Sequence, residues 1–508
     1  MPERAEGETN HITGPPSLLR NTLSIIGIGV ASLAAINIAF LVFIDYFHPS
    51  PYVGIFAYMI LPAILILGLA LIPIGATLER RRRHHMKPGE VPVFPRLDLN
   101  APAARRSVIA FLVFAIVFVA LSAAGSYRAY QYSDSVRFCG ETCHTVMRPE
   151  YTTYLQSPHA RVACVECHVG PGAGWYVRSK LSGAYQVYAA AFNKYPRPIP
   201  TPVANLRPAQ QTCEQCHWPR RFYGAQLKVF THFSYDEKNT PRQIQMLINI
   251  GGAEPSAGMP SGIHWHMNIA NRVTYIATDA QRQVIPWVQI EDREGHITVY
   301  HAKSSPLTPD QVKSGAKRLM DCIDCHTRPS HIFTPPDQSI DSSLLAHRID
   351  PSIPYIKQQA VAALTATYTS DEQAEAGITK SLTNFYLQKY PGQYSAASAE
   401  LKQAITEVKR VYNTTIFPYM KVDWRTHPNN IGHYYFPGCF RCHDGEHVSA
   451  DGKIIPKDCN TCHSVLTQSQ TQLPVTASAP SIPFKHPVDI GDLSQMTCSD
   501  CHTGAAMQ

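Results

Sequence analysis

The sequence predicts a membrane-anchored fold with three transmembrane helices and, beyond them, a mostly α-helical and irregular domain that contains a small β insertion. Two observations support this prediction. Three apolar runs, at residues 23–47, 54–78 and 108–125, each approach the roughly 20 residues that a helix needs to cross a bilayer. All 14 cysteines follow these runs, in seven pairs that are each followed directly by a histidine.

The segments between the apolar runs predict how the chain is oriented. The link between the first two runs, around Asp45 to Tyr52, contains no lysine or arginine. The segment between the second and third runs holds eight basic residues: Arg80, Arg81, Arg82, Arg83, Lys87, Arg96, Arg105 and Arg106. Because basic loops stay in the cytoplasm, we expect the residues after about Ser126 in the periplasm of a bacterial inner membrane. No small-residue cleavage site closes the first run, so it is expected to remain as an anchor.

Six of the cysteine pairs have the spacing C-x-x-C-H, the attachment signature of a c-type haem. The two thiols add to the two vinyl groups of the porphyrin, and the adjacent histidine ligates the iron. The six sets are Cys164/Cys167/His168, Cys213/Cys216/His217, Cys322/Cys325/His326, Cys439/Cys442/His443, Cys459/Cys462/His463 and Cys498/Cys501/His502. A seventh set, Cys139/Cys143/His144, has three residues between its thiols, which one longer loop still fits to the same two vinyl groups.

A lone cysteine pair is equally typical of a zinc site or a disulfide, but neither requires a histidine after every second cysteine. The sequence therefore predicts a multihaem cytochrome c with seven haems and their iron. The formal net charge is +7, to which the basic cytoplasmic segment contributes most. Since each haem adds two propionates, the outer domain is expected to be near neutral or acidic, and nucleic acid is not an expected partner.

We expect the porphyrins to form much of the core of the outer domain, with little regular secondary structure. Alternating apolar and polar residues over 273–302 predict a small β-meander. Helical spacing predicts helices near 179–192, 371–390 and 395–416. The first of these helices either lies on the membrane surface or packs on the core in the ordinary way.

Second iron ligands must come from histidines outside the motifs. Of 23 histidines, 12 remain once the seven motif histidines and the four before residue 86 are set aside. Placement near motifs or in loops flanked by glycine and proline favours His159, His264, His331, His433, His447 and His486 as distal ligands. His266 and His427 are held in reserve, and we expect ordinary surface roles for His232, His296, His301 and His347.

Three segments together resemble the NapC/NirT family of membrane-anchored quinol dehydrogenases. They are Cys139 to Met147, the SPHA sequence that leads into CVECH, and CIDCHTRPSH at 322–331. The extra spans and haems are similar to seven-haem inner-membrane cytochromes of the ImcH type. The resemblance implies an anchor at 1–128, a three-haem module at 129–217, an insertion carrying the meander at 218–317, a fourth haem at 318–335, and a helical linker with three more haems at 336–508.

The resemblance also implies a quinol site. In the family a methionine shortly after the first haem motif ligates that iron, which makes Met147 and His144 competing ligands here. The family places a lysine and an acid six or seven residues apart at this site. Lys180 matches the lysine, but Gln186 and Val187 stand where the acid is expected. Candidate replacements for the acid are Glu141, Glu150 and Asp134.

The expected function is electron transfer from menaquinol in the membrane lipid, through the haems, to periplasmic c-type cytochromes, in support of extracellular or metal-oxide respiration. One alternative is a terminal reductase of a small nitrogen substrate, which needs an iron with an open position. That alternative is disfavoured because every motif ends in histidine. Another alternative runs electrons inward to the quinone pool. The acceptor is expected to dock near Cys498 to His502, at the end of the haem series.

Overall fold

The computed structural model describes residues 18–47, 60–84, 99–110, 113 and 127–505. Gaps in these ranges fall at 20, 104, 107, 129–130, 143, 171, 204–205, 219–221, 223, 252–261, 268–270, 396–397, 469–480 and 492–495. The chain divides into two compact units. One contains residues 1–133 and 169–184, and the other contains 134–168 and 185–508.

Two antiparallel apolar helices form the main contact of the first unit, α1 (Thr22–Phe47) and α3 (Leu61–His84). Small residues let the two backbones approach, because a Cβ on Gly27 would lie 2.8 Å from the Gly68 carbonyl oxygen. The Ser24 hydroxyl donates to the Ile72 carbonyl at 2.9 Å. Both helices are long and apolar enough to cross a membrane. The third predicted span, 108–125, lies almost wholly outside the described residues.

The second unit contains two antiparallel sheets. The first has the order β1-β2-β8, from strands Ala225–Phe233, Pro241–Asn249 and His463–Gln468. The second has the order β6-β3-β4-β5-β7, from Arg318–Leu319, Arg272–Ile276, Trp287–Glu291, Ile297–Ala302 and His447–Ser449. Strands β3, β4 and β5 form a meander over the residues whose alternation predicts one. Strand β7, just after the fifth motif, joins the second sheet, and β8, which begins at the histidine of the sixth motif, joins the first. Sequence alternation predicted neither strand.

Short helical turns carry or flank the cysteine motifs. They are η2 (Phe138–Thr142), α5 (His144–Leu155), α6 (Cys164–His168), α8 (Ala209–Cys213), α10 (Cys322–Cys325), η7 (Gly438–Arg441), η8 (Cys459–Thr461) and α15 (Cys498–Cys501). Three further turns are η5 (Ile263–Met267), α9 (Pro309–Ser314) and η6 (Pro418–Met420). The longer helix α7 (Ala173–Ala191) begins in the first unit and ends in the second.

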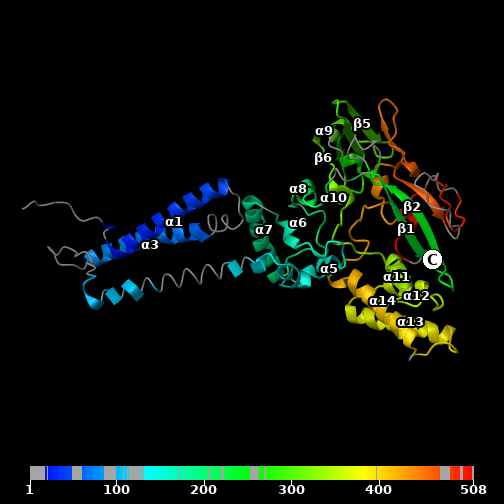
Figure 1. The fold of residues 1–508 in the computed structure, drawn as a ribbon, viewed down its shortest axis with the longest axis horizontal. Helices are drawn as coiled ribbons and strands as arrows, with labels where there is room; N and C mark the ends of the chain where they lie inside the picture. Colours follow the sequence, from blue (N-terminus) through cyan, green and yellow to red (C-terminus); the bar gives the residue numbers. More distant parts are fainter. Residues whose placement is uncertain are drawn as a thin grey trace, which may run out of the picture. The chain divides into compact units, whose positions relative to one another are not determined.

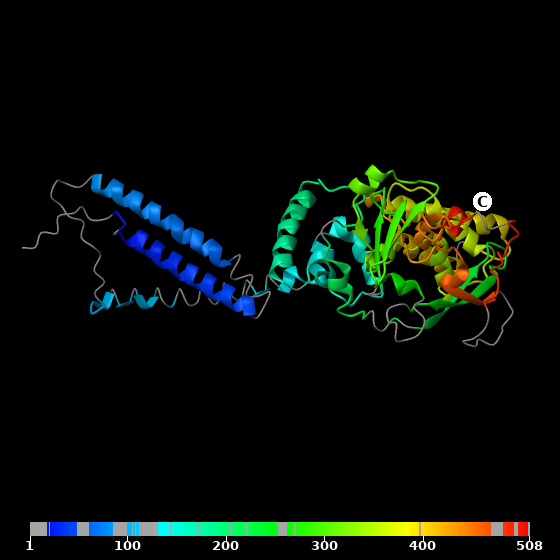
Figure 2. The same cartoon turned by 90° about the horizontal axis from the view of Figure 1, so that it is seen from above.

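A helical lobe follows the fourth motif. It contains α11 (Pro336–Leu345), α12 (Ile356–Thr365), α13 (Asp371–Lys389) and α14 (Ala399–Thr415), which pack against one another (Figures 1 and 2). Helix α13 buries Ala374, Ile378, Leu382 and Tyr386 completely, one residue on each turn of the same face. The Ser370 hydroxyl caps this helix by accepting from the Gln373 amide.

This lobe corrects the expectation of little regular secondary structure in the outer domain. A cluster of buried apolar side chains extends from Ile340 to Tyr412 and includes residues from all four helices. The reason is that residues 336–415 contain no cysteine motif, so this segment buries its own apolar side chains to be stable. Regular secondary structure is therefore extensive in the lobe.

Glu407 on α14 gives the lobe a predicted pH dependence. Burial opposes its charged form, but hydrogen bonds from Arg410, Ser343 and Arg348 outweigh burial and lower the pKa of Glu407 to about 2. A carboxyl whose pKa is depressed in the folded state stabilises the fold above its unfolded pKa, and this contribution is lost as the pH falls. We expect urea midpoints to fall between about pH 4.5 and 2, and Glu407→Gln to remove this part of the slope. An unchanged slope in the variant would contradict the assignment.

Candidate haem-binding sites

Most of the cysteine motifs fold as a short helical turn. The amide of the motif histidine donates to the carbonyl of the first cysteine in four motifs, at 2.8 Å for His217 and His326, 3.0 Å for His443 and 2.9 Å for His502. This is the hydrogen bond of a helical turn. All the cysteines that the structure describes are free and none forms a disulfide.

Buried polar contacts fix the fourth motif to the second sheet. Asp324, which stands between Cys322 and Cys325, is 2% exposed. Its carboxylate accepts from Tyr275 at 2.7 Å, Arg318 at 2.8 Å and Arg282 at 3.0 Å. Tyr275 lies on β3, so this network holds α10 against the sheet and sets the direction of its thiols.

Six motif histidines each face a histidine from elsewhere in the chain. The distances between ring centroids are all 5.8–6.5 Å. The pairs are His168 with His331, His217 with His159, His326 with His264, His443 with His266, His463 with His433, and His502 with His486.

This spacing suits one iron between each pair of rings. Imidazole nitrogens bind transition metals at about 2 Å, which places the centroids of two opposed rings roughly 6 Å apart. The six pairs therefore fit six-coordinate irons with histidine on both sides. This spacing and the free thiols are the features of a covalently held c-type haem.

Hydrogen bonds orient most of the facing histidines for metal binding. A backbone carbonyl lies within 3.1 Å of Nδ1 in His159, His264, His266, His331 and His486. Because a carbonyl only accepts, Nδ1 carries the proton and Nε2 keeps its lone pair for iron. Burial lowers the pKa of His266 and of His331 to about 4, which keeps both rings neutral.

The structure corrects the prediction for His447, which is not a facing histidine. Its Nδ1 lies 2.9 Å from an Asp444 carboxylate oxygen and its Nε2 lies 2.7 Å from the Ile285 carbonyl. Both nitrogens are used, so neither is left for a metal. His266, held in reserve by the sequence argument, faces His443 in its place.

His264 and His266 lie on one turn, η5, and face motifs four and five. Gly262 begins this turn at φ +133°, a conformation that side chains rarely adopt, and a Cβ there would lie 2.4 Å from the Gly251 carbonyl. The sequence signal for this turn is the pattern histidine, tryptophan, histidine after a glycine. One short segment therefore joins the fourth motif to the C-terminal three.

Consecutive motifs lie beside one another from the first to the last. A thiol hydrogen bond from Cys139 contributes most to lowering the pKa of Cys164 to about 7, and a similar bond joins Cys213 to Cys322. Electrostatic effects on cysteine pKa values connect the remaining neighbours. These are Cys167 with Cys216, Cys325 with Cys439, Cys439 with Cys462, and Cys459 with Cys498. The order in space thus follows the order in the chain.

The chain is similar to known c-type cytochromes. The family model described as "NapC/NirT cytochrome c family, N-terminal region" matches residues 101–198. The chain is 45% identical over 497 residues to the cytochrome c-type protein ImcH of Geobacter sulfurreducens, covering 98% of this chain and 96% of that protein. The chain belongs to the NapC/NirT cytochrome c family. It is an ImcH-like, membrane-anchored multihaem cytochrome c that transfers electrons, as its motifs predict.

Two other relatives of this NapC/NirT cytochrome match a smaller part of it. The cytochrome c-type protein NrfH of Wolinella succinogenes is 32% identical over 114 residues, which is 22% of this chain and 63% of that protein. The cytochrome c-type protein TorC of Escherichia coli is 28% identical over 137 residues, 23% of this chain and 35% of that protein. No solved structure matches the chain.

The region implied as a quinol site in this NapC/NirT cytochrome is only partly described. Met147 is half-buried on α5, whereas Cys143 and the side chains of His144 and Lys180 lie outside the described residues. Gln186 is exposed on α7. At 3.6 residues per turn, a position six residues after Lys180 does not share its helix face, whereas Val187, seven residues on, does.

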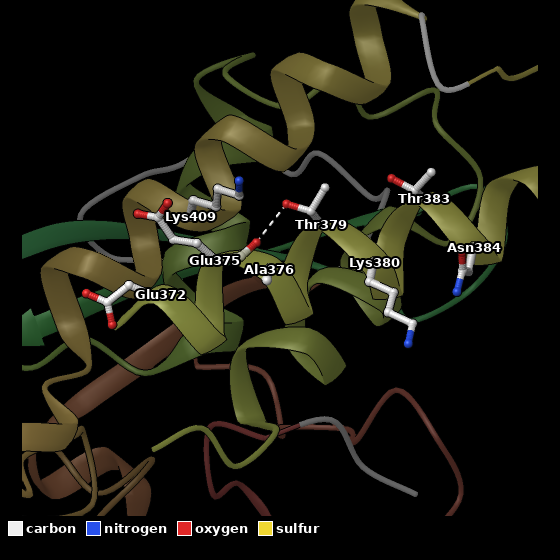
Figure 3. Close-up of a pocket in the computed structure, with 8 residues that line it drawn as sticks. All are labelled: Glu372, Glu375, Ala376, Thr379, Lys380, Thr383, Asn384 and Lys409. Atoms are coloured by element: carbon white, nitrogen blue, oxygen red, sulfur yellow. Dashed lines mark hydrogen bonds between the residues drawn. The ribbon is translucent and has the colours of Figure 1, made fainter. Parts of the chain in front are cut away.

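The candidate acids differ in their surroundings. Glu141 is half-exposed and pairs with Arg137 at 3.0 Å. Glu150 is half-buried on α5, and desolvation raises its pKa above the ordinary value against the opposing effect of Arg328. A shallow pocket on the helical lobe is unrelated to the motifs (Figure 3). It is lined by side chains of α13 together with Lys409 of α14, and no cysteine or histidine is among them.

Proposed function

We propose that this chain is an inner-membrane quinol dehydrogenase that passes electrons from menaquinol, through seven c-type haems, to periplasmic cytochromes in extracellular or metal-oxide respiration. The observation that carries the proposal is the set of six facing histidine pairs along a continuous series of motifs. Haem supplies a one-electron carrier at each site. The 45% identity to an ImcH protein, over 98% of this chain, supports the same function.

The proposal assigns each residue of the motifs a role in holding the cofactor. The paired cysteines form the thioether bonds, and the six motif histidines with a facing ring bind iron from one side. His159, His264, His266, His331, His433 and His486 bind iron from the other side. At the first site, His144 or Met147 is the ligand. Two ligands at each of the six irons leave no position for a small substrate, which favours electron transfer over a terminal reductase.

The proposed entry point for electrons is the first motif. It follows the predicted third span, 108–125, by about a dozen residues, so a lipid-soluble donor reaches it from the bilayer surface. Quinol oxidation releases two protons, and a positioned side chain near the first site must accept them. We propose Lys180 and Gln186 on α7, with Met147 on α5, as residues of this site. In this proposal the chain crosses the membrane three times and its haem domain lies in the periplasm.

Anaerobic mixing of the detergent-solubilised protein with a menaquinol analogue tests this function. We expect several haems to be reduced, as followed in the α-band absorbance, and the rate to fall in Met147→Leu and in Lys180→Ala. Lys194→Ala is the control, because Lys194 is an exposed lysine just beyond α7. If quinol reduces no haem while dithionite reduces them all, the chain is not a quinol dehydrogenase.

A further inference from the structure

A group of buried polar atoms without hydrogen-bond partners lies where two segments of the second unit meet. Within the described part of the chain, these atoms are Nη2 of Arg328, Nε2 of His427, and both side-chain polar atoms of Asn430. The three residues are 7%, 4% and 1% exposed. Such groups are normally paired in a folded protein, because a buried polar atom without a partner loses its hydrogen bonds to water and gains none in return.

Contacts between the two segments place these residues together. The Thr327 hydroxyl donates to the Pro428 carbonyl at 2.8 Å and accepts from the Asn430 amide at 3.2 Å. Arg328 is near enough to His427 for its charge to add to burial in lowering the pKa of His427 to about 4. The ring of His427 also lies 6.0 Å from that of Phe333, over which the Arg328 guanidinium stacks at 4.9 Å.

The guanidinium is only partly satisfied by the protein. Its Nε donates to the His331 carbonyl at 2.7 Å, while Nη2 points to no acceptor. The charge of Glu150 acts on Arg328, but among the described residues the two form no ion pair, and Oε2 of Glu150 also has no partner there. A buried cation without a hydrogen-bonded counterion is unfavourable, so the free Nη2 favours a further anion here.

The free atoms are suited to a carboxylate. Arg328 and Asn430 each present an N–H, and Nε2 of His427 becomes a donor when the Thr201 hydroxyl, 3.0 Å away, donates to Nδ1. A guanidinium beside a planar amide is the arrangement that holds carboxylates with two hydrogen bonds. The location identifies the source, because Arg328 stands two residues after His326 and three before His331. Arg328 therefore adjoins, in the chain, a histidine of the fourth haem site and a histidine that faces the second.

We propose that Arg328, Asn430 and His427 bind a propionate carboxylate of the haem at the second or fourth motif. The inference rests on the proposed function only in requiring that haem is attached at these motifs. It makes His427 a residue that holds the porphyrin edge, and not a ligand of iron. Pairing the propionate with a buried cation keeps it ionised and fixes its charge while the iron changes oxidation state.

Mediated redox titration of the fully loaded protein tests the proposal independently of quinol oxidation. We expect Arg328→Met to lower the midpoint potential of the second or fourth haem, because the uncompensated propionate favours the oxidised iron. The same potential should become pH-dependent, because the propionate now takes up a proton on reduction. The propionate-bending band in resonance Raman spectra should shift. Asn430→Leu should give a smaller change in the same direction.

Arg425→Met is the matched control, since Arg425 is exposed and pairs with Asp423 at 2.5 Å. Its titration curve should equal that of the wild type, and all variants should retain seven haems by haemochrome assay. Unchanged potentials and Raman bands in both Arg328→Met and Asn430→Leu would overturn the proposal. A high-spin haem in His427→Leu would also overturn it, by making His427 an iron ligand. Midpoint potentials that change with the concentration of added acetate would instead show that Arg328, Asn430 and His427 bind a free anion.

Discussion

Serine in place of both Cys322 and Cys325 is expected to divide electron flow into two halves. The variant lacks the fourth haem, which leaves three haem sites before the break and three after it. The third motif adjoins the fourth and the fourth adjoins the fifth, so we expect the fourth haem to be the link between the two halves. We expect a menaquinol analogue to reduce the first three haems rapidly. About half of the remaining absorbance change should move to a much slower phase.

The matched control removes one haem from the end of the series. Serine at Cys498 and Cys501 leaves six haems without a break, so nearly all the absorbance change should stay in the fast phase. Dithionite should reduce all six haems in both variants, which shows that they are loaded. A single fast phase in the Cys322/Cys325 variant would show that electrons cross between the two halves by another route, and that the series is branched.

The sequence alone identified the covalent chemistry of the site. Thioether attachment requires its residues at fixed spacing in the chain, so C-x-x-C-H is legible without a fold. The family resemblance, which depends on these same segments, is confirmed by the comparison with ImcH. Facing histidines follow no such spacing, yet five of those proposed, His159, His264, His331, His433 and His486, do lie opposite a motif histidine.

His447 shows why the sixth assignment failed. Closeness in sequence to the fifth motif made it attractive, but it lies on β7, whose pairing with β5 directs its ring towards Ile285. The histidine that faces the fifth motif comes from η5, some 180 residues earlier. Such a contact depends on how the insertion folds over the second sheet. The residues next to the fifth motif in the sequence cannot predict that packing.

The fold was predicted best where side-chain periodicity reflects burial on one face. The meander at 273–302 and the helices α13 and α14 are of this kind. Strands β7 and β8 contain few residues, and partners distant in sequence decide their pairing, so alternation cannot reveal them. The expectation of little regular secondary structure failed in the lobe, because residues 336–415 contain no cysteine motif and bury their own apolar side chains in packed helices.

Lys357→Met is expected to destabilise the second unit by about 3–5 kcal/mol, the usual penalty for removing one partner of a buried ion pair. Nζ of Lys357 lies 2.6 Å from an Asp341 carboxylate oxygen, and the two side chains are 4% and 5% exposed. Nζ also donates to the Phe233 carbonyl at 2.6 Å, and the Phe233 amide donates to Asp341 at 3.0 Å. The pair thus joins the end of β1 to helices α11 and α12.

Urea unfolding followed by circular dichroism in the haem absorption band measures this change. Tyr434 stacks between His232 and His502, with centroid distances of 5.4 and 4.3 Å, and His232 contacts Asp341 at 3.2 Å. The band should therefore report the seventh site as it opens.

Lys453→Met removes an exposed pair with Asp451 and should change stability by about 0–1 kcal/mol. The double variant Lys357→Met/Asp341→Asn should be less destabilised than the sum of the single variants, because it no longer leaves a buried charge unpaired. Additive losses of stability would show that Lys357 acts through packing alone, and that the ion pair does not hold β1 to the helical lobe.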